Sequence, residues 1–417
     1  MELKNNRDFK ILRIGQIVHS VSETHKFDKE RLIAINTSDV LNGVLGKGVE
    51  TPIEELKGQF KKTIKNNDLL FSEIRPANRR FAKVGTGNWE NYVISTKLMV
   101  LRKYNYEVDL DYFYYCLTNQ PFLETLQRRA ENRIGSFPQI TFDLLATYAF
   151  PIPPIDEQKR IAPTISNIDR KIELNKRIND NLEAMAKQLY DYWFVQFDFP
   201  NGEGKPYKSS GGAMVWNEKL KREIPEGWNC GTLLDIAEYT NGIACQKFRP
   251  TNDNKLPVIK IKEMHDGLSA DTEWVTNNIP ESVKVYDGDV LFSWSASLEV
   301  MLWAYGNGGL NQHIFKVTSK NGYPRSFYFY QLVNYIGVFK QMAEARKTTM
   351  GHITQDHLKQ STIALPPSVD IANKLEEQLC PIFDEIVRNN QEIMALTKQR
   401  DELLPLLMNG QASVNAD

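Results

Sequence analysis

Residues 149–161 read AFPIPPIDEQKRI, so that a proline-rich stretch leads directly into a charged segment with good helix formers. A similar segment, IALPPSVDIANKL, follows at residues 363–375, and its double proline lies 213 positions after the first. Proline holds the preceding residue in extended backbone and is tolerated near the start of a helix. The two segments therefore predict two helices, each beginning where a globular part of the chain ends.

Other pairs of matching segments occur in the same order along the chain. Ile140-Thr141 recurs as Ile353-Thr354, YFYYCL at 112–117 recurs as FYFYQL at 327–332, and DLLFS at 68–72 recurs as DVLFS at 289–293. Each match alone is weak, but their shared order predicts a tandem duplication. Each repeat covers about half of the 417 residues, which is far longer than the repeating unit of a solenoid.

The composition is that of a globular protein, with 41% apolar and 25% charged residues. No run of about 18 apolar residues is present, and the N-terminus lacks the apolar stretch of a signal peptide. The four cysteines lie far apart without a CxxC pair, which argues against a disulfide framework or a zinc knuckle and favours a reducing cytoplasm. The net charge of −1 means that any site for a polyanion has to be local.

The globular parts are predicted to combine helices and strands. KNNDLLFS at 65–72 and VYDGDVLFS at 285–293 each place turn-forming residues before a short apolar strand. Residues 92–102 and 313–319 read as further strands. The aromatic runs at 112–117 and 327–332 begin helical segments, and we expect them to pack in a core rather than to form exposed platforms for bases.

Two long helices with a heptad seam are predicted, and an antiparallel coiled coil between them is the expected way to bury both stripes. The first helix also continues its apolar pattern through Ile178 and Met185, after a stammer near Asn175 that shifts the phase. Asn175 and Asn389 would fix the register. The predicted seam residues are Ile165, Ile168, Ile172, Leu182 and Leu189 in the first helix and Leu379, Ile386, Asn389, Ile393, Leu396 and Leu403 in the second. Pro163 and Pro381 predict a kink in each helix, or a first helix that starts near Pro163.

The predicted fold class is α+β, with two pseudo-repeated globular domains joined by the two long helices. Glycine, serine and proline residues after the first helix mark a linker. The expected boundaries are 1–153 for the first globular domain, 154–197 for the first helix, 198–227 for the linker, 228–366 for the second globular domain, 367–410 for the second helix and 411–417 for a tail.

Motifs of common enzymes are absent from the sequence. It contains no GxxxxGK[ST] loop, no GxGxxG unit between a strand and a helix, no Asn-Pro-Pro-aromatic tetrad, no HExxH and no GxSxG. The segment DEQKR at 156–160 suits the solvated first turn of a helix, although a nuclease site with Asp143 as its second carboxylate is an alternative. The sequence thus favours a binding protein with no catalytic residues and no metal site, and a site built from distant residues stays open.

Positive charge is concentrated between Lys57 and Lys103, where eleven Lys or Arg residues face three acids, a local net charge of +8. A solvated loop would account for this, but phosphate contacts from such a face supply most nonspecific affinity for DNA. Glycines in 133–139 and 346–352 would allow backbone to approach phosphate closely, and a plain loop is equally compatible with them. The candidate DNA-binding residues are Lys61, Lys62, Arg75, Arg79, Arg80, Lys83, Arg133 and Ser136 in the first part and Lys247, Arg249, Lys260, Lys262, Arg346, Lys347 and His352 in the second.

Three segments resemble one protein family. Residues 152–198, IPPIDEQKRIAPTISNIDRKIELNKRINDNLEAMAKQLYDYWFVQFD, resemble the central helical region of specificity subunits of type I restriction–modification enzymes. KSSGGAMVWNEKLKREIPEGW at 208–228 is similar to the linker of that family and its entry into a second domain. LTKQRDELLPLLMNGQ at 396–411 is similar to its closing motif.

The resemblance implies a non-catalytic, cytoplasmic subunit with two target recognition domains, each reading one half of a bipartite sequence in double-stranded DNA. The paired helices would set the gap between the halves and dock two methylation subunits. The resemblance also implies that the chain binds no cofactor itself. S-adenosylmethionine, ATP and Mg would belong to the methylation and restriction subunits.

Two alternatives remain at the level of sequence. The first is a coiled-coil scaffold protein with peptide-binding globular ends, which would show no salt-dependent binding to DNA. The second is an enzyme whose site is assembled from residues far apart in the chain, which would bind S-adenosylmethionine or ATP as a single chain.

Overall fold

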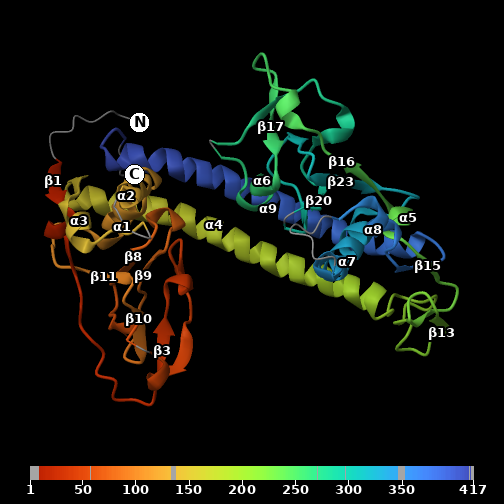
Figure 1. Cartoon of the computed structure of the whole chain (residues 1–417), viewed down its shortest axis with the longest axis horizontal. Coiled ribbons are helices and arrows are strands. Elements are labelled where there is room, and N and C mark those ends of the chain that lie inside the picture. The colour runs from red at the N-terminus through yellow and green to blue at the C-terminus, as the bar shows by residue number, and fades with distance from the viewer. Residues whose placement is uncertain are drawn as a thin grey trace. The chain divides into compact units, whose positions relative to one another are not determined.

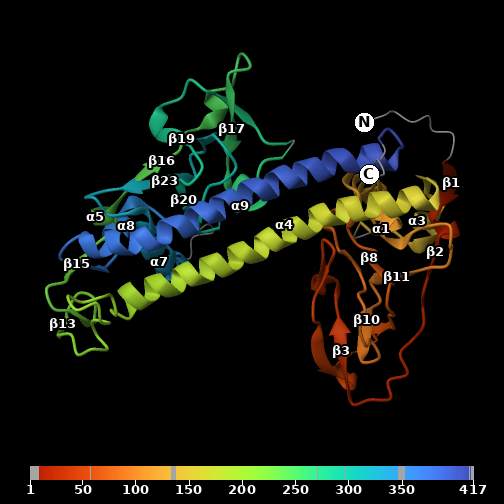
Figure 2. The same ribbon diagram turned by 180° about the vertical axis from the view of Figure 1, so that it is seen from behind.

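The structure is a computed structural model that describes residues 9–56, 58–132, 138–269, 271–295, 297–345, 353–412 and 414. The chain divides into two compact units, the first formed by Met1–Arg170 with Leu396–Asp417 and the second by Lys171–Ala395. Each unit contains one globular part together with a portion of both long helices, α4 and α9 (Figures 1 and 2). The helices thus belong to the cores of both units.

The globular part of the first unit contains two four-stranded sheets, in the orders β2-β11-β8-β9 and β6-β3-β10-β7. Within them β3 and β10 are parallel, and the other neighbours are antiparallel. The strands are β1 (Lys10–Arg13), β2 (Val18–Ser20), β3 (Arg31–Ile35), β4 (Val40–Leu41), β5 (Val44–Leu45), β6 (Val49–Pro52), β7 (Phe60–Lys62), β8 (Leu69–Ser72), β9 (Phe81–Lys83), β10 (Tyr92–Ser95), β11 (Leu98–Lys103) and β12 (Ala149–Ile152). The short helices are α1 (Leu110–Thr118), α2 (Gln120–Glu131) and α3 (Phe142–Thr147).

The second unit repeats this topology. Its sheets have the orders β16-β23-β20-β21 and β18-β17-β22-β19, and β17 and β22 form the parallel pair. The strands are β13 (Met214–Asn217), β14 (Arg222–Pro225), β15 (Asn229–Gly231), β16 (Ala237–Asn241), β17 (Lys255–Ile259), β18 (Trp274–Thr276), β19 (Lys284–Val285), β20 (Val290–Ser293), β21 (Glu299–Leu302), β22 (Gly308–Leu310), β23 (Ile314–Ser319) and β24 (Ile363–Leu365). The short helices are α5 (Leu233–Ile236), α6 (Ile261–Asp266) and α8 (Gln355–Lys359), and a longer one is α7 (Arg325–Ala345). The predicted duplication and the α+β class are confirmed.

The residues that match between the repeats hold equivalent turns. Asp68 and Asp289 each precede a central strand, and each accepts a hydrogen bond from the backbone three residues earlier, at 2.8 Å from Lys65 N and 2.7 Å from Tyr286 N. Thr141 and Thr354 are the N-cap residues of α3 and α8. The sequence matches therefore mark the turns and caps of the scaffold.

The aromatic runs lie in the two cores. Tyr112 and Phe113 of α1 have no exposed surface, and Phe327 and Tyr330 of α7 are 1% and 4% exposed. The expectation of core packing is thus confirmed, and these rings are not available to stack on bases.

The long helices are α4 (Ile155–Tyr190) and α9 (Asp370–Met408), of 36 and 39 residues. Both run through their internal prolines, so the expectation that the first helix starts near Pro163 is wrong. Pro163 lies in the third turn of α4, and α4 already begins directly after the double proline. After Tyr190 the helix widens into a π-helical turn, Asp191–Val195.

The seam of α4 keeps one phase over its whole length. Buried or half-buried positions alternate in steps of four and three, at residues 161, 165, 168, 172, 175, 179, 182, 186 and 189. Asn175 and Asn179 fill two of these positions and are 5% and 6% exposed, whereas Ile178 and Met185 are 36% and 52% exposed. The expected stammer is therefore wrong, because two asparagines, and not the neighbouring apolar residues, continue the seam.

The two helices are antiparallel in both units. In the first unit Arg400 Nη1 of α9 donates to Asp169 Oδ1 of α4 at 3.0 Å. In the second unit Asn389 Nδ2 donates to Asn179 Oδ1 at 2.9 Å, so higher numbers on α4 meet lower numbers on α9. Ile165, Ile172, Leu379, Ile386 and Asn389 are buried, and Ile168, Leu182, Leu189, Ile393, Leu396 and Leu403 are half-buried.

The segment predicted as a linker, 198–227, is folded into the core of the second unit. Its strands β13 and β14 form an antiparallel hairpin. The Phe199 ring stacks on Tyr207 and on Trp228, with ring centroids 4.8 and 5.3 Å apart. Asp198 accepts hydrogen bonds from the Ser209 hydroxyl and backbone, which lower the pKa of that carboxyl. The segment connects the repeats in sequence but is held by its own contacts.

We expect the Asn179–Asn389 pair to act as a unit. Asn179→Leu should lower the free energy of unfolding by about 1–3 kcal/mol, because it leaves the buried Asn389 amide without its acceptor. The double change to leucine should recover most of this loss, since two apolar groups then fill the seam. Urea unfolding followed by circular dichroism measures both, with the exposed Asn181→Leu as control, and strictly additive losses would contradict the pairing.

Candidate nucleic-acid interface

Several basic side chains of the first unit form hydrogen bonds or ion pairs within that unit. Lys62 is half-buried, and its Nζ donates to the carbonyl oxygens of Leu98 at 2.7 Å and Thr96 at 3.1 Å. Burial lowers the pKa of this amine. Lys83 forms an ion pair with Asp111. These two predicted DNA-binding residues therefore join strands and a helix within the domain.

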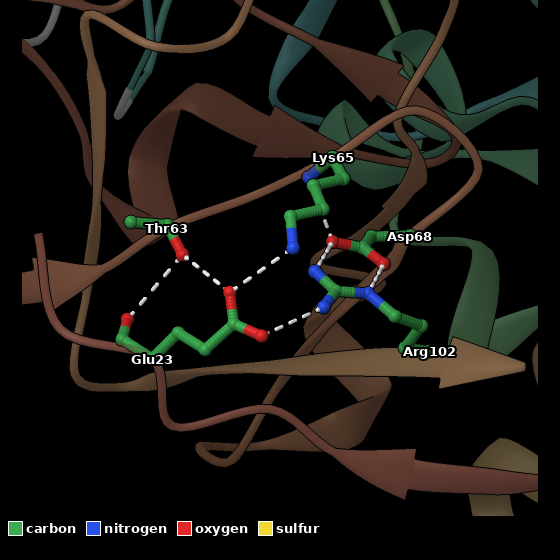
Figure 3. Close-up of polar contacts among 5 residues, drawn as sticks. All are labelled: Glu23, Thr63, Lys65, Asp68 and Arg102. Atoms are coloured by element: carbon green, nitrogen blue, oxygen red, sulfur yellow. Dashed lines mark hydrogen bonds and ion pairs between the residues drawn. The ribbon is translucent and has the colours of Figure 1, made fainter.

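The turn before β8 is held by a polar network of five residues, which are Glu23, Thr63, Lys65, Asp68 and Arg102 (Figure 3). Arg102 of β11 donates through Nε and Nη2 to the two carboxylate oxygens of Asp68, both at 2.8 Å, and these bonds raise the pKa of Arg102. Its Nη1 donates to Glu23 Oε1 at 3.1 Å. Lys65 lies 3.3 Å from Glu23 Oε2, and this contact lowers the pKa of that carboxyl. The network neutralises two of the eleven cations of the basic segment.

Two arginines of the loop between β8 and β9 form hydrogen bonds to neighbouring segments. Arg79 donates to Asn42 Oδ1 at 3.0 Å and to Gln120 Oε1 at 2.8 Å. Arg80 Nη1 donates to the carbonyl oxygens of Ser38 at 3.1 Å and Val40 at 3.3 Å. Both guanidiniums are thereby held against neighbouring segments of the first unit.

Two candidates of the first unit are exposed and unengaged. The side chains of Lys61 and Arg75 form no hydrogen bond or ion pair within the part of the chain that the structure describes. They are therefore the cations of this set that are free to meet an external anion. Arg133 and Ser136 lie outside the described residues, as do Arg346, Lys347 and His352 of the second unit.

In the second unit, two of the four described candidates are ion-paired. Lys260 Nζ lies 2.6 Å from Glu273 Oε1, and this contact lowers the pKa of the carboxyl. Lys262 lies 3.9 Å from Asp271. Both lysines retain partial exposure, so the pairs reduce their net charge toward an external anion without hiding them.

Exposed aromatic side chains accompany the remaining cations of the second unit. Trp274 on the edge strand β18 is 47% exposed, and Lys255 Nζ lies 4.9 Å from the centroid of its ring. Phe248, which is 39% exposed, stands between the exposed Lys247 and Arg249 in the sequence. Sequence reasoning missed both rings, although the alternation of Trp274 with the buried Val275 could have indicated an outward tryptophan. Rings beside cations suit contacts with both bases and phosphates.

A second apolar stripe lies on α4, away from its seam. Leu174, Ile178, Met185 and Tyr192 are 52%, 36%, 52% and 37% exposed. Their spacing of four, seven and seven residues places them on one face of the helix and its π-helical end. Exposed apolar side chains gathered on one face of a helix are a characteristic of a protein interaction surface.

Among the described residues, no group of three His, Cys, Asp or Glu side chains could hold a metal ion. Within the same residues, no helix is long and apolar enough to cross a membrane.

A family model described as the type I restriction modification DNA specificity domain matches the sequence twice, at residues 4–184 and 225–399. The HindI specificity subunit of a type I restriction enzyme from Haemophilus influenzae is 28% identical, over 97% of this chain and 99% of that protein. The MjaIX specificity subunit from Methanocaldococcus jannaschii is 26% identical, over 73% of this chain and 69% of that protein.

Among solved structures, the S subunit of a type I restriction-modification system from M. genitalium aligns with a TM-score of 0.56 and 15% identity. The alignment covers 98% of both chains, so the likeness in fold extends over the whole length.

Replacement of Arg102 by methionine should destabilise the first unit by about 3 kcal/mol, because it leaves the Asp68 carboxylate, 1% exposed, without its bidentate partner. Lys65→Met removes a cation from the exposed edge of the same network and should cost less than about 1 kcal/mol. Thermal unfolding of the two variants provides the comparison. Equal shifts in melting temperature would show that the network does not depend on the buried pair.

Proposed function

Since this chain belongs to the type I restriction modification DNA specificity domain family, we propose that it selects the DNA target of a type I restriction–modification complex. The two globular parts are assigned as target recognition domains, each reading one half of a bipartite sequence. The duplication carries this proposal, because each of the two family matches coincides with one copy of the same strand topology.

The differences between the two copies also support two separate half-sites. The first copy presents Arg75 on a left-handed turn, whereas the second presents Trp274 beside Lys255. Base edges in the major groove differ in their donors and acceptors, so different half-sites require different side chains on a common frame.

The long helices are assigned as the spacer that sets the gap between the half-sites. At 1.5 Å per residue, α4 and α9 are about 55–60 Å long. Half-sites read on one face of DNA lie about 34 Å apart, or a multiple of that distance. The buried seam residues Asn175, Asn179 and Asn389 suit this role, since polar seam residues specify one register at some cost in stability.

Catalysis is assigned to partner subunits, and this chain contributes recognition. Methylation subunits would carry S-adenosylmethionine, and restriction subunits would carry ATP and Mg. The exposed stripe of Leu174, Ile178, Met185 and Tyr192 is the surface of α4 that we assign to docking of a methylation subunit. The assembled complex would act on genomic DNA in the cytoplasm.

Footprinting tests the central proposal. Methylation-sensitive sequencing of the host genome first identifies a split motif, and the chain is then assembled with its methylation subunits on DNA that carries this motif. Two protected patches separated by an unprotected gap are expected. One continuous patch, or protection that does not depend on the motif, would contradict a bipartite reader.

Glutamates in the stripe should prevent docking without unfolding the chain. Leu174→Glu combined with Met185→Glu removes two apolar contacts worth about 1.5–3 kcal/mol each, so affinity for the methylation subunit should fall at least tenfold. The matched control is Lys176→Glu, which changes the net charge by the same amount at an exposed position on another face of the helix. Sedimentation of the mixed subunits measures assembly, and undiminished binding by the stripe variant would remove this face from the interface.

A further inference from the structure

The connection from β8 to β9 in the first unit, and from β20 to β21 in the second, differs between the repeats, while the contacts that support it are the same. In the first unit it spans residues 73–80, and in the second it spans 294–298. Before each connection, Ser72 and Ser293 donate to a carbonyl two residues on, Ile74 O at 3.1 Å and Ser295 O at 3.2 Å. The scaffold is thus repeated up to the connection, and the connection itself is specific to each unit.

An equivalent backbone hydrogen bond supports the connection in both units. Ile140 N donates to Glu73 O at 2.8 Å, and Ile353 N donates to Trp294 O at 3.0 Å. These isoleucines belong to the repeated Ile-Thr pair that precedes α3 and α8. A shared support beneath a variable loop is the arrangement expected of a surface that presents different side chains from one frame.

In the first unit the loop is held in an unusual backbone conformation. Residues Pro76–Asn78 form a short 3-10 turn, and the residues on either side of it, Arg75 and Arg79, have φ of 46° and 54°. Residues other than glycine and asparagine rarely adopt this left-handed conformation, because it brings Cβ close to the backbone. Strain of this kind persists only where surrounding contacts enforce it, and it clusters at binding sites.

The enforcing contacts surround the turn. Arg79 is clamped to Asn42 and Gln120, and Arg80 to the backbone of 38–40. Ala77 N donates to Gln127 Oε1 at 3.2 Å, and Arg75 N donates to Pro138 O at 3.0 Å. The turn is therefore fixed to the β4–β5 hairpin, to α2 and to the strand-like segment before α3.

Two side chains project from this fixed turn. Arg75 and Asn78 are both exposed, while Pro76 between them is buried. Neither side chain forms a hydrogen bond or ion pair among the described residues, so their donors and acceptors are free. Their positions three residues apart place a guanidinium and a carboxamide on one rigid support.

We propose that Arg75 and Asn78 are the residues of the first unit that read base edges, an inference that rests on the proposed function. Arg75 would donate two hydrogen bonds to O6 and N7 of a guanine, and Asn78 would pair with N6 and N7 of an adenine in the major groove. Arg79 and Arg80 act as positioning residues, because Nε and Nη1 of Arg79 and Nη1 of Arg80 are already bonded within the unit. A loop fixed before binding loses little conformational entropy when it meets DNA.

The test measures how the chain, assembled with its methylation subunits, discriminates among DNA targets that carry every single base-pair change in the bipartite motif. Arg75→Ala should weaken binding to the intact target by about ten- to a hundredfold and abolish discrimination at one G·C pair. Asn78→Ala should do the same at one A·T pair. Both variants should leave discrimination in the other half-site unchanged.

Two further variants separate base reading from other causes. Arg75→Lys keeps the charge but loses the bidentate fork, so it should lose discrimination at the G·C pair while the salt dependence of binding stays the same. Lys61→Ala, an exposed cation of the same unit, should weaken binding to all targets alike and lower the salt slope by about one if it meets phosphate. Thermal unfolding verifies that each variant is folded.

Full retention of base discrimination by folded Arg75→Lys and Asn78→Ala variants would overturn the assignment while leaving the proposed function intact. Failure of the unaltered complex to prefer any sequence would instead overturn the proposed function, and the assignment with it.

Discussion

The burial of one apolar face by each long helix is the constraint on which the rest of the molecule depends. Both α4 and α9 depend on this packing, because most of the stability of a helix in a protein comes from its packed apolar face. The asparagines of the seam restrict how the two can meet: Asn179 bonds to Asn389 and Asn390, and Asn175 bonds to Glu392. A slip by one turn would break all of these bonds, and the same slip would separate Arg400 from Asp169 in the first unit. The apolar seam thus supplies the attraction, and the polar layer selects one alignment.

The two repeats share the same turns, but the carboxylates in these turns pair with cations at different positions. Asp68 and Asp289 occupy the same turn before the same strand, yet Asp68 is neutralised by Arg102 and Asp289 by Lys316 at 2.8 Å. These cations do not occupy equivalent places in their strands: Lys316 pairs with Leu291 of β20, and Leu70, the equivalent of Leu291, pairs with Val100, two residues before Arg102. The turn is demanded by the backbone, whereas the charge that satisfies its carboxylate comes from β11 in one unit and from the equivalent strand β23 in the other, at positions two residues apart. Repeats can therefore diverge widely in sequence while the topology remains.

The sequence was sufficient to predict the duplication, the two helices and the α+β class, because each leaves a long pattern or a repeated order of residues. It was not sufficient to predict the phase of the first seam. Ile178 and Met185 read as seam residues by hydrophobicity, and only the facing helix reveals that Asn175 and Asn179 are buried in their place. The sequence was also not sufficient to predict which basic side chains are free. Arg80 is engaged by carbonyl groups 40 and 42 residues away, and Arg102 by a carboxylate 34 residues away, so no local pattern separates them from Arg75. The segment after α4 is rich in turn formers, which local composition cannot distinguish from a flexible connection.

The anchoring of the β8–β9 turn has a consequence for evolution. Arg80 grips carbonyl oxygens, which every amino acid provides, so substitutions at Ser38 or Val40 that preserve the local backbone would leave its grip in place. The side chains of Arg75 and Asn78 make no contacts that folding requires among the described residues. New side chains at Asn78 would therefore carry little folding penalty, whereas the left-handed backbone at Arg75 disfavours β-branched residues there. A lineage could drift from one recognition preference to another by few mutational steps while inheriting an unaltered frame.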